Sequence, residues 1–351
     1  MFEPADPVAR KSAALGCFLG GACGDALGSP VDFLTLEQIQ LQYGPTGIHD
    51  FAFAYGRRGA VTSSTQMMLF TAEGIIDAFD KNHAASDGDI TRRVHLAYLR
   101  WLATQEDLDD ILVPADQPKG LISTSELHQQ RNPSFSSLQS LRGTRPLGSL
   151  AANTFGGPSA VARIAPVSIA FIGDTMRAFA VASALARLTH GHPSAYVPAG
   201  AFAMILAFIL EGMALDPAIE NTLDLLQTVE DHQETTNALI YSPWPDSDPK
   251  PRASWMGWGW TGAEALAVAL HSVASTKSLE AAIIAAANHD GNSGVTACLA
   301  GQLAGAIYGA EAVPTRWIKD IELRDVTIEL AGNVASMSNS SFDVEGIDSA
   351  L

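Results

Sequence analysis

The chain has 351 residues and a formal net charge of −17, from 21 Lys and Arg against 38 Asp and Glu. Apolar residues make up 47% of the chain and charged residues 17%, which supplies a large core and excludes an intrinsically disordered protein. The acidic balance argues against nucleic acid and anionic membranes as partners, since both attract a basic face. We therefore expect partners that are neutral, basic or bridged by a metal ion.

Helical residues dominate and alternating β-branched residues are scarce, so the pattern predicts an all-α fold. The predicted helices, in chain order, cover residues 9–28, 65–80, 89–103, 175–189, 199–213, 218–232, 261–274, 278–288 and 294–309. Loops rich in Pro, Gly and Ser are expected at 44–62, 111–123, 131–160 and 243–259. With no internal repeat and no long linker, we predict a single compact multi-helix domain over residues 1–335 and a polar C-terminal tail over 336–351.

The cysteines and the apolar segments indicate where the chain resides. Cys17, Cys23 and Cys298 lie in apolar sequence without metal-site spacing, which predicts reduced thiols and a cytoplasmic location. The N-terminus lacks the basic start and apolar run of a signal peptide. The longest apolar stretch, Ala199 to Leu210, is too short to span a bilayer and predicts a buried helix.

Two predicted helices carry small residues at every fourth position, which places them on one helical face. Each Gly weakens an isolated helix by about 1 kcal/mol relative to Ala, so such a stripe indicates that a backbone or a ligand approaches closely. The pattern favours close helix packing as the reason. The stripes consist of Gly16, Gly20, Gly24 and Gly28 in one helix, and Ala297, Gly301, Gly305 and Gly309 in the other.

Common catalytic signatures are missing: the sequence has no GxxxxGK[ST], GxSxG, HExxH or CxxC, and its glycine run does not read GxGxxG. Four other segments are informative. They are GGACGDALGSPVDF (20–33), VTSSTQM (61–67), NTFGGPSAVARIAP (153–166, with Thr189-His190 further on) and NHDGNSGVT (288–296), and GWTGAEAL (259–266) precedes the last.

In this order the segments resemble motifs of the ADP-ribosylglycohydrolase family, which includes dinitrogenase-reductase-activating glycohydrolases. The corresponding family patterns are GxxxGDALGxPxEF, TDDTxM, NxSxGxGxxMRxxP followed by Thr-His, NHSGDSDST and GWxxEEAL, and the resemblance runs from about residue 12 to 310. It implies an all-α domain with a cleft in which two Mg²⁺ ions position the terminal ribose of an ADP-ribosyl group and a water. Such hard ions take oxygen ligands, usually including carboxylates.

The sequence departs from the family where those ligands are expected. Of six expected ligand positions, only Thr62 keeps its residue type. Neutral oxygens alone hold Mg²⁺ weakly, so we expect no Mg²⁺ cofactor and a loss of the two-metal hydrolysis. The replacements are Ser63, Ser64, Asn292 and Gly294 for four aspartates, and Val295 for a serine.

Three aspartates near these motifs are candidates for an acid, a base or a displaced single-ion site: Asp25, Asp32 and Asp290. Each also has a structural interpretation. Asp25 could accept hydrogen bonds from loop amides, Asp32 could be a surface loop residue, and Asp290 could cap the following helix.

The resemblance also implies candidate ligand-binding residues. They are Thr62, Ser63, Ser64, Asn153, Gly156, Gly157, Ser159, Arg163, Asn292 and Ser293. Arg163 could instead pair with a core carboxylate, and Ser63 with Gln66 predicts a capping box. The helix N-termini beside Ser63 and Asn292 could then hold an anion.

Aromatic and histidine residues near the motifs are open to two interpretations. Trp255, Trp258 and Trp260 form the densest aromatic patch, and we expect Trp260 to pack in the core while the other two face the cleft or a partner. His190, His192 and His289 lack metal-site spacing and are expected to be hydrogen-bonded structural residues.

We expect a pseudoenzyme that binds ADP-ribose, ADP-ribosylated protein or a protein partner. A basic toxin held by an acidic immunity protein is one such partner, because opposite charges speed association. The alternatives are an active hydrolase that removes ADP-ribose or cleaves a related glycoside with an altered or absent metal site, and a different small-molecule enzyme on the same scaffold.

Overall fold

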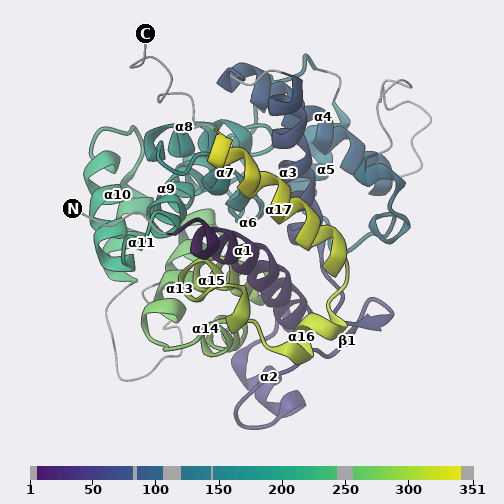
Figure 1. The fold of residues 1–351 in the computed structure, drawn as a ribbon. Helices are drawn as coiled ribbons and strands as arrows, with labels where there is room; N and C mark the ends of the chain where they lie inside the picture. Colours follow the sequence, from purple (N-terminus) through teal and green to yellow (C-terminus); the bar gives the residue numbers. More distant parts are fainter. Residues whose placement is uncertain (1–5, 82–84, 106–119, 144, 243–255, 341–351) are drawn as a thin grey trace.

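The structure is a computed structural model that describes residues 6–81, 85–105, 120–143, 145–242 and 256–340. Figure 1 shows helices along the whole described chain, and the sole sheet in these ranges is a hairpin of two short strands in which Phe53 pairs with Arg58. The helices from the N-terminus to the middle of the chain are α1 (Pro7–Gly28), η1 (Ser29–Val31), α2 (Leu36–Tyr43), α3 (Ser63–Lys81), α4 (Asp87–Gln105), η2 (Leu121–Ser123), η3 (Ser125–Leu127), α5 (Phe135–Arg142), α6 (Ser159–Ala162) and α7 (Ala165–Ala170), with strands β1 (Phe53–Ala54) and β2 (Arg57–Arg58) between α2 and α3. The remaining helices are α8 (Thr175–Ala186), α9 (Pro193–Leu210), α10 (Leu215–Leu226), α11 (Gln233–Tyr241), α13 (Gly262–Ala274), α14 (Leu279–Ala287), α15 (Ser293–Tyr308), η4 (Ala310–Ala312), α16 (Thr315–Asp320) and α17 (Arg324–Ser340).

The predicted all-α fold is confirmed, and each of the nine predicted helices has a counterpart in the structure. The prediction for α9 was wrong at its start: the helix begins at Pro193 instead of Ala199, and it contains Pro198. Helix α5 lies in a segment predicted as loop, and Ser134 caps it by accepting from the Ser137 amide. Helix α17 runs to Ser340, past the boundary predicted between domain and tail, and residues 341–351 lie outside the described part.

Helices α1 and α15 lie side by side and antiparallel at the centre of the fold (Figure 1). A Cβ atom built on Gly20 would lie 2.2 Å from the carbonyl oxygen of Gly301, and one built on Gly24 would lie 1.9 Å from that of Ala297. The glycine stripes therefore serve helix packing, as the sequence favoured, and they let two backbones meet without an intervening side chain.

The same contact sets the position of the ends of both helices. A Cβ on Gly28, the last residue of α1, would lie 2.2 Å from the carbonyl oxygen of Ser293, the first residue of α15. The chain leaving α1 thus passes directly beside the N-terminus of α15. This juxtaposition brings the first and fourth sequence motifs together.

Helix α9 is the one helix of the described residues that is long and apolar enough to cross a membrane by those criteria alone. Within the fold, 83% of that helix is buried, which is the environment of a core helix. The three cysteines are also buried and unpaired, and burial raises the thiol pKa of Cys17, Cys23 and Cys298.

Replacing Gly24 with Ala should destabilise the protein strongly, because the new methyl group would overlap the α15 backbone. We expect a loss of at least about 2 kcal/mol in the free energy of unfolding, measured by urea denaturation. Gly332 is the matched control, since it lies inside α17 with no heavy atom within 4 Å of a built Cβ. Gly332→Ala should stabilise the protein by about 0.5–1 kcal/mol, and equal effects of the two substitutions would contradict the packing argument.

Candidate ligand-binding cleft

The four sequence motifs converge on one cleft with a volume of about 140 Å³. It lies where the segment after α1 meets the N-termini of α3, α5, α6 and α15. Six predicted ligand-binding residues line it, namely Thr62, Ser63, Ser64, Gly157, Ser159 and Asn292. The other lining residues are Asp32, Phe33, Asn132, Ser134, Ser136, Pro158, Gly294 and Val295.

Asp25 is fully buried behind the cleft at the N-terminus of α3. Its carboxylate accepts hydrogen bonds from the amide and hydroxyl of Thr62, at 2.8 and 2.6 Å, and from the amide and hydroxyl of Thr65, at 3.3 and 2.6 Å. Burial raises the pKa of Asp25, while these four hydrogen bonds act in the opposite direction. The carboxylate is therefore saturated with protein donors and does not line the cleft.

Asp32 is the carboxylate that faces the cleft. Its Oδ1 accepts a hydrogen bond of 2.6 Å from the amide of Gly294, at the N-terminus of α15, and its Oδ2 receives a longer one of 3.4 Å from Asn132. Burial raises the pKa of Asp32 to about 7, the negative charge of Asp25 adds to this effect, and the Gly294 amide opposes it. Asp32 is thus a cleft carboxyl that titrates near neutral pH.

The helix N-termini are capped differently from the sequence prediction. Thr62, not Ser63, precedes α3, and its hydroxyl accepts from the amide of Ser64 at 3.2 Å. The Ser63 hydroxyl donates to the carbonyl of Asn132, and Gln66 does not complete a capping box. Since Asp25 and Asp32 already accept from the amides at the starts of α3 and α15, these N-termini are not open anion sites.

Asp290 does not belong to the cleft. Its Oδ1 accepts a hydrogen bond of 2.6 Å from the amide of Leu36, the first residue of α2. The expected capping role is present, but it serves α2 instead of the helix that follows Asp290 in the chain. Of the three candidate aspartates, Asp32 is therefore the one that a cleft ligand can reach.

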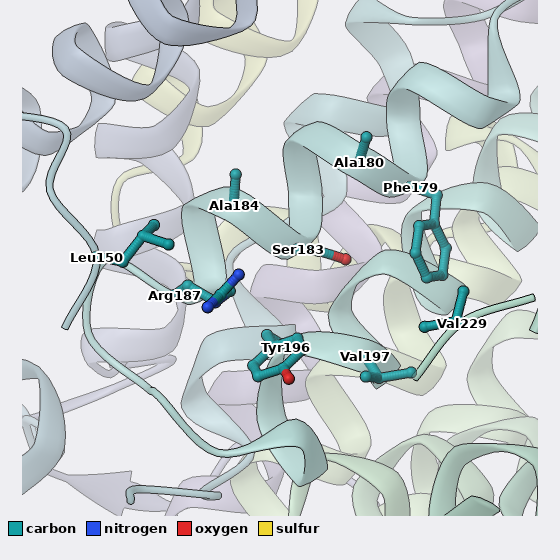
Figure 2. Close-up of a pocket in the computed structure, with 9 residues that line it drawn as sticks. All are labelled: Leu150, Phe179, Ala180, Ser183, Ala184, Arg187, Tyr196, Val197 and Val229. Carbon is teal, nitrogen blue, oxygen red and sulfur yellow. The ribbon is translucent and has the colours of Figure 1, made fainter. Parts of the chain in front are cut away.

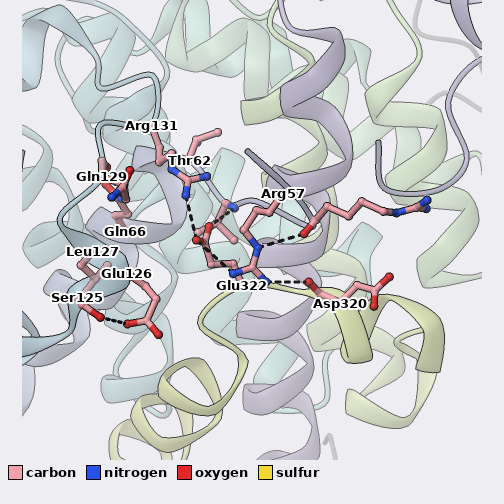
Figure 3. Close-up of polar contacts among 12 residues, drawn as sticks. Arg57, Thr62, Gln66, Ser125, Glu126, Leu127, Gln129, Arg131, Asp320 and Glu322 are labelled. Carbon is pink, nitrogen blue, oxygen red and sulfur yellow. Dashed lines mark hydrogen bonds and ion pairs between the residues drawn. The ribbon is translucent and has the colours of Figure 1, made fainter. Parts of the chain in front are cut away.

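A buried ion pair anchors the approach to α3, as Figure 3 shows. Glu322, between α16 and α17, pairs with Arg131 at 3.1 Å and with Arg57 at 3.5 Å, and its other oxygen accepts from the amide of Val61 at 3.1 Å. The carbonyl of Arg131 in turn accepts from the amide of Ser63 at 2.8 Å. Glu322, from the C-terminal part of the chain, thus fixes the segment that holds Arg131 beside the start of α3.

Serine hydroxyls form the opposite wall, and a buried histidine supports them. The Nε2 atom of His190 lies 2.7 Å from the hydroxyl of Ser136 and 3.1 Å from that of Ser159. Its Nδ1 lies 2.7 Å from the hydroxyl of Thr189, which also accepts a hydrogen bond of 2.6 Å from Arg163. Burial, with the nearby Arg163 charge, lowers the pKa of His190 well below its usual value, so the imidazole is neutral.

The direction of the hydrogen bonds that run from Arg163 through Thr189 to His190 can be assigned from the guanidinium, which can only donate. Because the Thr189 oxygen accepts from Arg163, we assign the Thr189 hydrogen to the Nδ1 atom of His190. The Nε2 atom then carries the imidazole proton and donates to the serine oxygens. The hydroxyls of Ser159 and Ser136 in turn donate to that of Ser134, at 3.0 and 3.3 Å, and Ser134 donates to Ser137 at 2.8 Å. The wall is therefore neutral and built from hydroxyl groups that bond to one another.

Four predicted ligand-binding residues lie outside the cleft. Arg163 is fully buried, and instead of the core carboxylate considered from the sequence it stacks 4.5 Å from the ring centre of Tyr98 and bonds to Thr189. The side chain of Asn153 bonds to the amides of Phe155 and Gly191 and so shapes its own loop. Gly156 accepts a backbone hydrogen bond from α13, and Ser293 is buried beneath the cleft surface.

Asn132, Ser134 and Ser136 line the cleft but were not predicted to do so, because the segment 131–160 was predicted to be a loop. The sequence does contain a pattern for a helix start, in which Ser134 precedes the apolar residues Leu138 and Leu141. This pattern predicts that the side chains near Ser134 lie at a helix N-terminus. His192 and His289 are hydrogen-bonded within the fold, to the Ser194 amide and the Thr296 hydroxyl respectively.

Aromatic side chains flank the cleft. Phe33, which lines it, stacks nearly parallel on Trp260 with ring centres 5.6 Å apart. Trp260 is 46% exposed, so the expectation that it packs in the core was wrong, and Trp258 is 47% exposed. On the side of Ser134 and Ser136, Phe135 meets Phe155 edge to face. Trp255 lies outside the described residues.

The oxygens that line the cleft do not fit a pair of Mg²⁺ ions. Asp32 is the one carboxylate among the lining residues, and Thr62 already donates to Asp25 and accepts from Ser64. Across the described residues, no group of three or more His, Cys, Asp or Glu side chains is placed to share a metal ion. Two Mg²⁺ ions bring four positive charges and ordinarily take several carboxylates in near-octahedral geometry.

Comparisons with known proteins agree with the fold and with the family resemblance. The chain matches the family model for ADP-ribosylglycohydrolase over residues 6–342, and it therefore belongs to the ADP-ribosylglycohydrolase family. It is 23% identical to the ADP-ribosyl-[dinitrogen reductase] glycohydrolase of Rhodospirillum rubrum, over 89% of this chain and 90% of that protein. It is also 23% identical to the ADP-ribosylarginine hydrolase Tri1 of Serratia proteamaculans, over 93% of this chain and 79% of that protein.

A solved structure shares the fold. A chain from a structure described as an ADP-ribosylglycohydrolase-related protein complex aligns with a TM-score of 0.66 and 23% sequence identity. The alignment covers 94% of this chain and 99% of the other.

The raised pKa of Asp32 predicts a pH dependence of stability. Between about pH 4, where an unfolded Asp ionises, and pH 7, the folded state retains a proton that the unfolded chain has released. The contribution of Asp32 to the free energy of unfolding therefore falls as the pH rises through this range. Asp32→Asn keeps an oxygen for the Gly294 amide and should lose less stability between pH 4 and 7 than the native protein in urea denaturation. Identical pH profiles would contradict the assignment.

Proposed function

We propose that this protein binds ADP-ribosyl groups in a metal-independent cleft and has lost the two-metal hydrolysis of its family. The observation that carries the proposal is the composition of the cleft wall: hydroxyls, amides and one carboxyl stand where a two-metal site would need several carboxylates. The partner is then ADP-ribose or an ADP-ribosylated protein.

The size and chemistry of the cleft suit a terminal ribose. A cavity of about 150 Å³ accommodates one six-membered ring, so the 140 Å³ cleft has room for about one sugar ring, with the rest of the ligand over the rim. Ribose hydroxyls both donate and accept hydrogen bonds, and they could join the network of serine hydroxyls, each of which also donates and accepts. The exposed Phe33–Trp260 pair offers an aromatic face at the same rim.

The charge behind the cleft also favours a ligand with phosphate groups. The buried guanidinium of Arg163 has no carboxylate within ion-pair distance among the described residues, and hydrogen bonds through Thr189 and His190 connect it to the serine wall. It therefore supplies positive potential on the cleft side of an otherwise acidic protein.

A binding assay and a hydrolysis assay together test the proposal. ADP-ribose should bind saturably in calorimetry without added metal, and ADP-ribosyl-arginine and ADP-ribosyl-serine peptides should release no ADP-ribose with or without Mg²⁺. Ser159→Ala should weaken ADP-ribose binding about threefold to tenfold, through the lost hydroxyl contact. Ser125→Ala, on an exposed turn away from the cleft, is the control. Mg²⁺-dependent release of ADP-ribose would overturn the proposal.

A second candidate function is an active hydrolase without the family's metal pair, and the near-neutral pKa of Asp32 favours it. A carboxyl with a pKa near the working pH is suited to general acid–base catalysis. In that case the same peptides release ADP-ribose without Mg²⁺, and Asp32→Asn abolishes the release while leaving ADP-ribose binding in place.

Placing carboxylates at the positions where the family motifs have aspartate tests whether the residues at these positions decide Mg²⁺ binding. A variant with aspartates at 63, 64, 292 and 294 and serine at 295 should bind Mg²⁺ in calorimetry, whereas the native protein should not. A Cβ at position 294 would lie 2.9 Å from Asp32 Oδ2, so Asp32 must shift in this variant. Tight Mg²⁺ binding by both proteins would show that the replaced positions do not decide metal binding.

A further inference from the structure

A second pocket lies between α8 and α9 and shares no lining residue with the ligand-binding cleft. Its volume is about 180 Å³. Figure 2 shows Arg187 and Tyr196 toward one end, Phe179 and Val229 toward the other, and the Ser183 hydroxyl between them. The remaining lining residues are Leu150, Ala180, Ala184 and Val197.

Ser183 is one of three α-helical residues in the described part of the chain, with Ser168 and Thr327, whose hydroxyl is buried without a hydrogen-bond partner, and of the three it is the one that lines this pocket. The hydroxyls of Thr71, Thr222 and Ser272 each donate to the carbonyl four residues earlier, at 2.8 Å. The Ser183 hydroxyl is buried and has no hydrogen-bond partner. It projects over Gly200 of α9, where a built Cβ would lie 2.3 Å from it. An unsatisfied buried hydroxyl costs stability, and Ser183 therefore offers the pocket a donor that has no acceptor within the protein.

Arg187 supplies a positive charge one helical turn from Ser183, on the same face of α8. Its guanidinium stacks 4.9 Å from the ring centre of Tyr196. Arg177, at the other end of α8, pairs with Asp87 at 2.7 Å, whereas Arg187 has no carboxylate within ion-pair distance among the described residues. In a protein with a net charge of −17, an arginine without an acidic partner beside a pocket favours an anionic ligand.

We propose that this pocket binds a small monocarboxylic acid with an apolar body. The carboxylate would receive hydrogen bonds from Arg187 and Ser183, and the apolar body would lie against Phe179, Val197 and Val229. The 180 Å³ volume suits one ring with a short acid side chain, and it is too small for a dinucleotide-sized ligand. The proposal does not depend on the function of the ligand-binding cleft.

Phenylacetate and its neutral isostere phenylacetamide form a matched pair of probes. Methyl NMR spectra should show saturable shifts at Ala184, Val197 and Val229 with phenylacetate, with a dissociation constant on the order of 1 mM. Phenylacetamide should bind about tenfold more weakly, because it lacks the charge that pairs with the guanidinium. Equal binding of the two probes, or no shift at these methyl groups, would overturn the proposal.

Variants separate the ligand contacts from effects on folding. Arg187→Gln should weaken phenylacetate binding about tenfold and leave phenylacetamide unchanged, while Arg58→Gln, at an exposed arginine outside the pocket, should change neither. Ser183→Ala should weaken phenylacetate binding and leave the Tm unchanged or higher, since it removes an unsatisfied buried hydroxyl. If the Arg187→Gln variant binds phenylacetate as tightly as the Arg58→Gln variant does, the proposal is wrong.

Discussion

The backbone contact between α1 and α15 is the constraint on which the rest of the structure depends. These two helices meet glycine against carbonyl along their length, as at Gly20 and Gly301. Such close packing fixes both the separation and the register of the pair. At the end of the pair it places the chain that leaves Gly28 beside the first turn of α15. The cleft exists because this junction brings motifs more than 250 residues apart within one hydrogen bond, from Gly294 to Asp32.

The junction also explains how two carboxylates are held at and behind the cleft. Asp25 and Asp32 accept hydrogen bonds from backbone amides at the starts of α3 and α15, where the helix dipole favours negative charge. Asp25 receives four donors and is buried, while Asp32 receives two and reaches the cleft. One carboxylate therefore organises the fold around the cleft, and the other is left available to a ligand. Among the residues that line the cleft, Asp32 is the single acid.

Motif order and helical periodicity made the fold and one half of the cleft predictable. Gly24 and Gly28 signalled a close backbone contact, and Thr62 to Ser64 could be placed at a helix start from their spacing alone. The other half was hidden because it depends on tertiary contacts. The hydrogen bond from the Leu36 amide to Asp290 joins segments that no local pattern connects, and so does the stacking of Trp260 on Phe33. The link from Arg163 to the serine wall likewise exists only once α6, α8 and α5 are packed.

Asp32 and Gly294 depend on each other in the cleft. The family motifs that this sequence resembles have a glutamate at position 32 and an aspartate at position 294. This chain has the shorter acid Asp32 at the first of these positions, and it faces Gly294, which has no side chain. A Cβ at position 294 would lie 2.9 Å from one oxygen of Asp32 and 3.1 Å from the other, so no larger residue fits beside the present Asp32 conformer. Conversely, the Gly294 amide that a side chain would crowd is the donor that holds Asp32. The residue at position 294 and the conformation of Asp32 are thus coupled, and a side chain introduced at position 294 requires Asp32 to move.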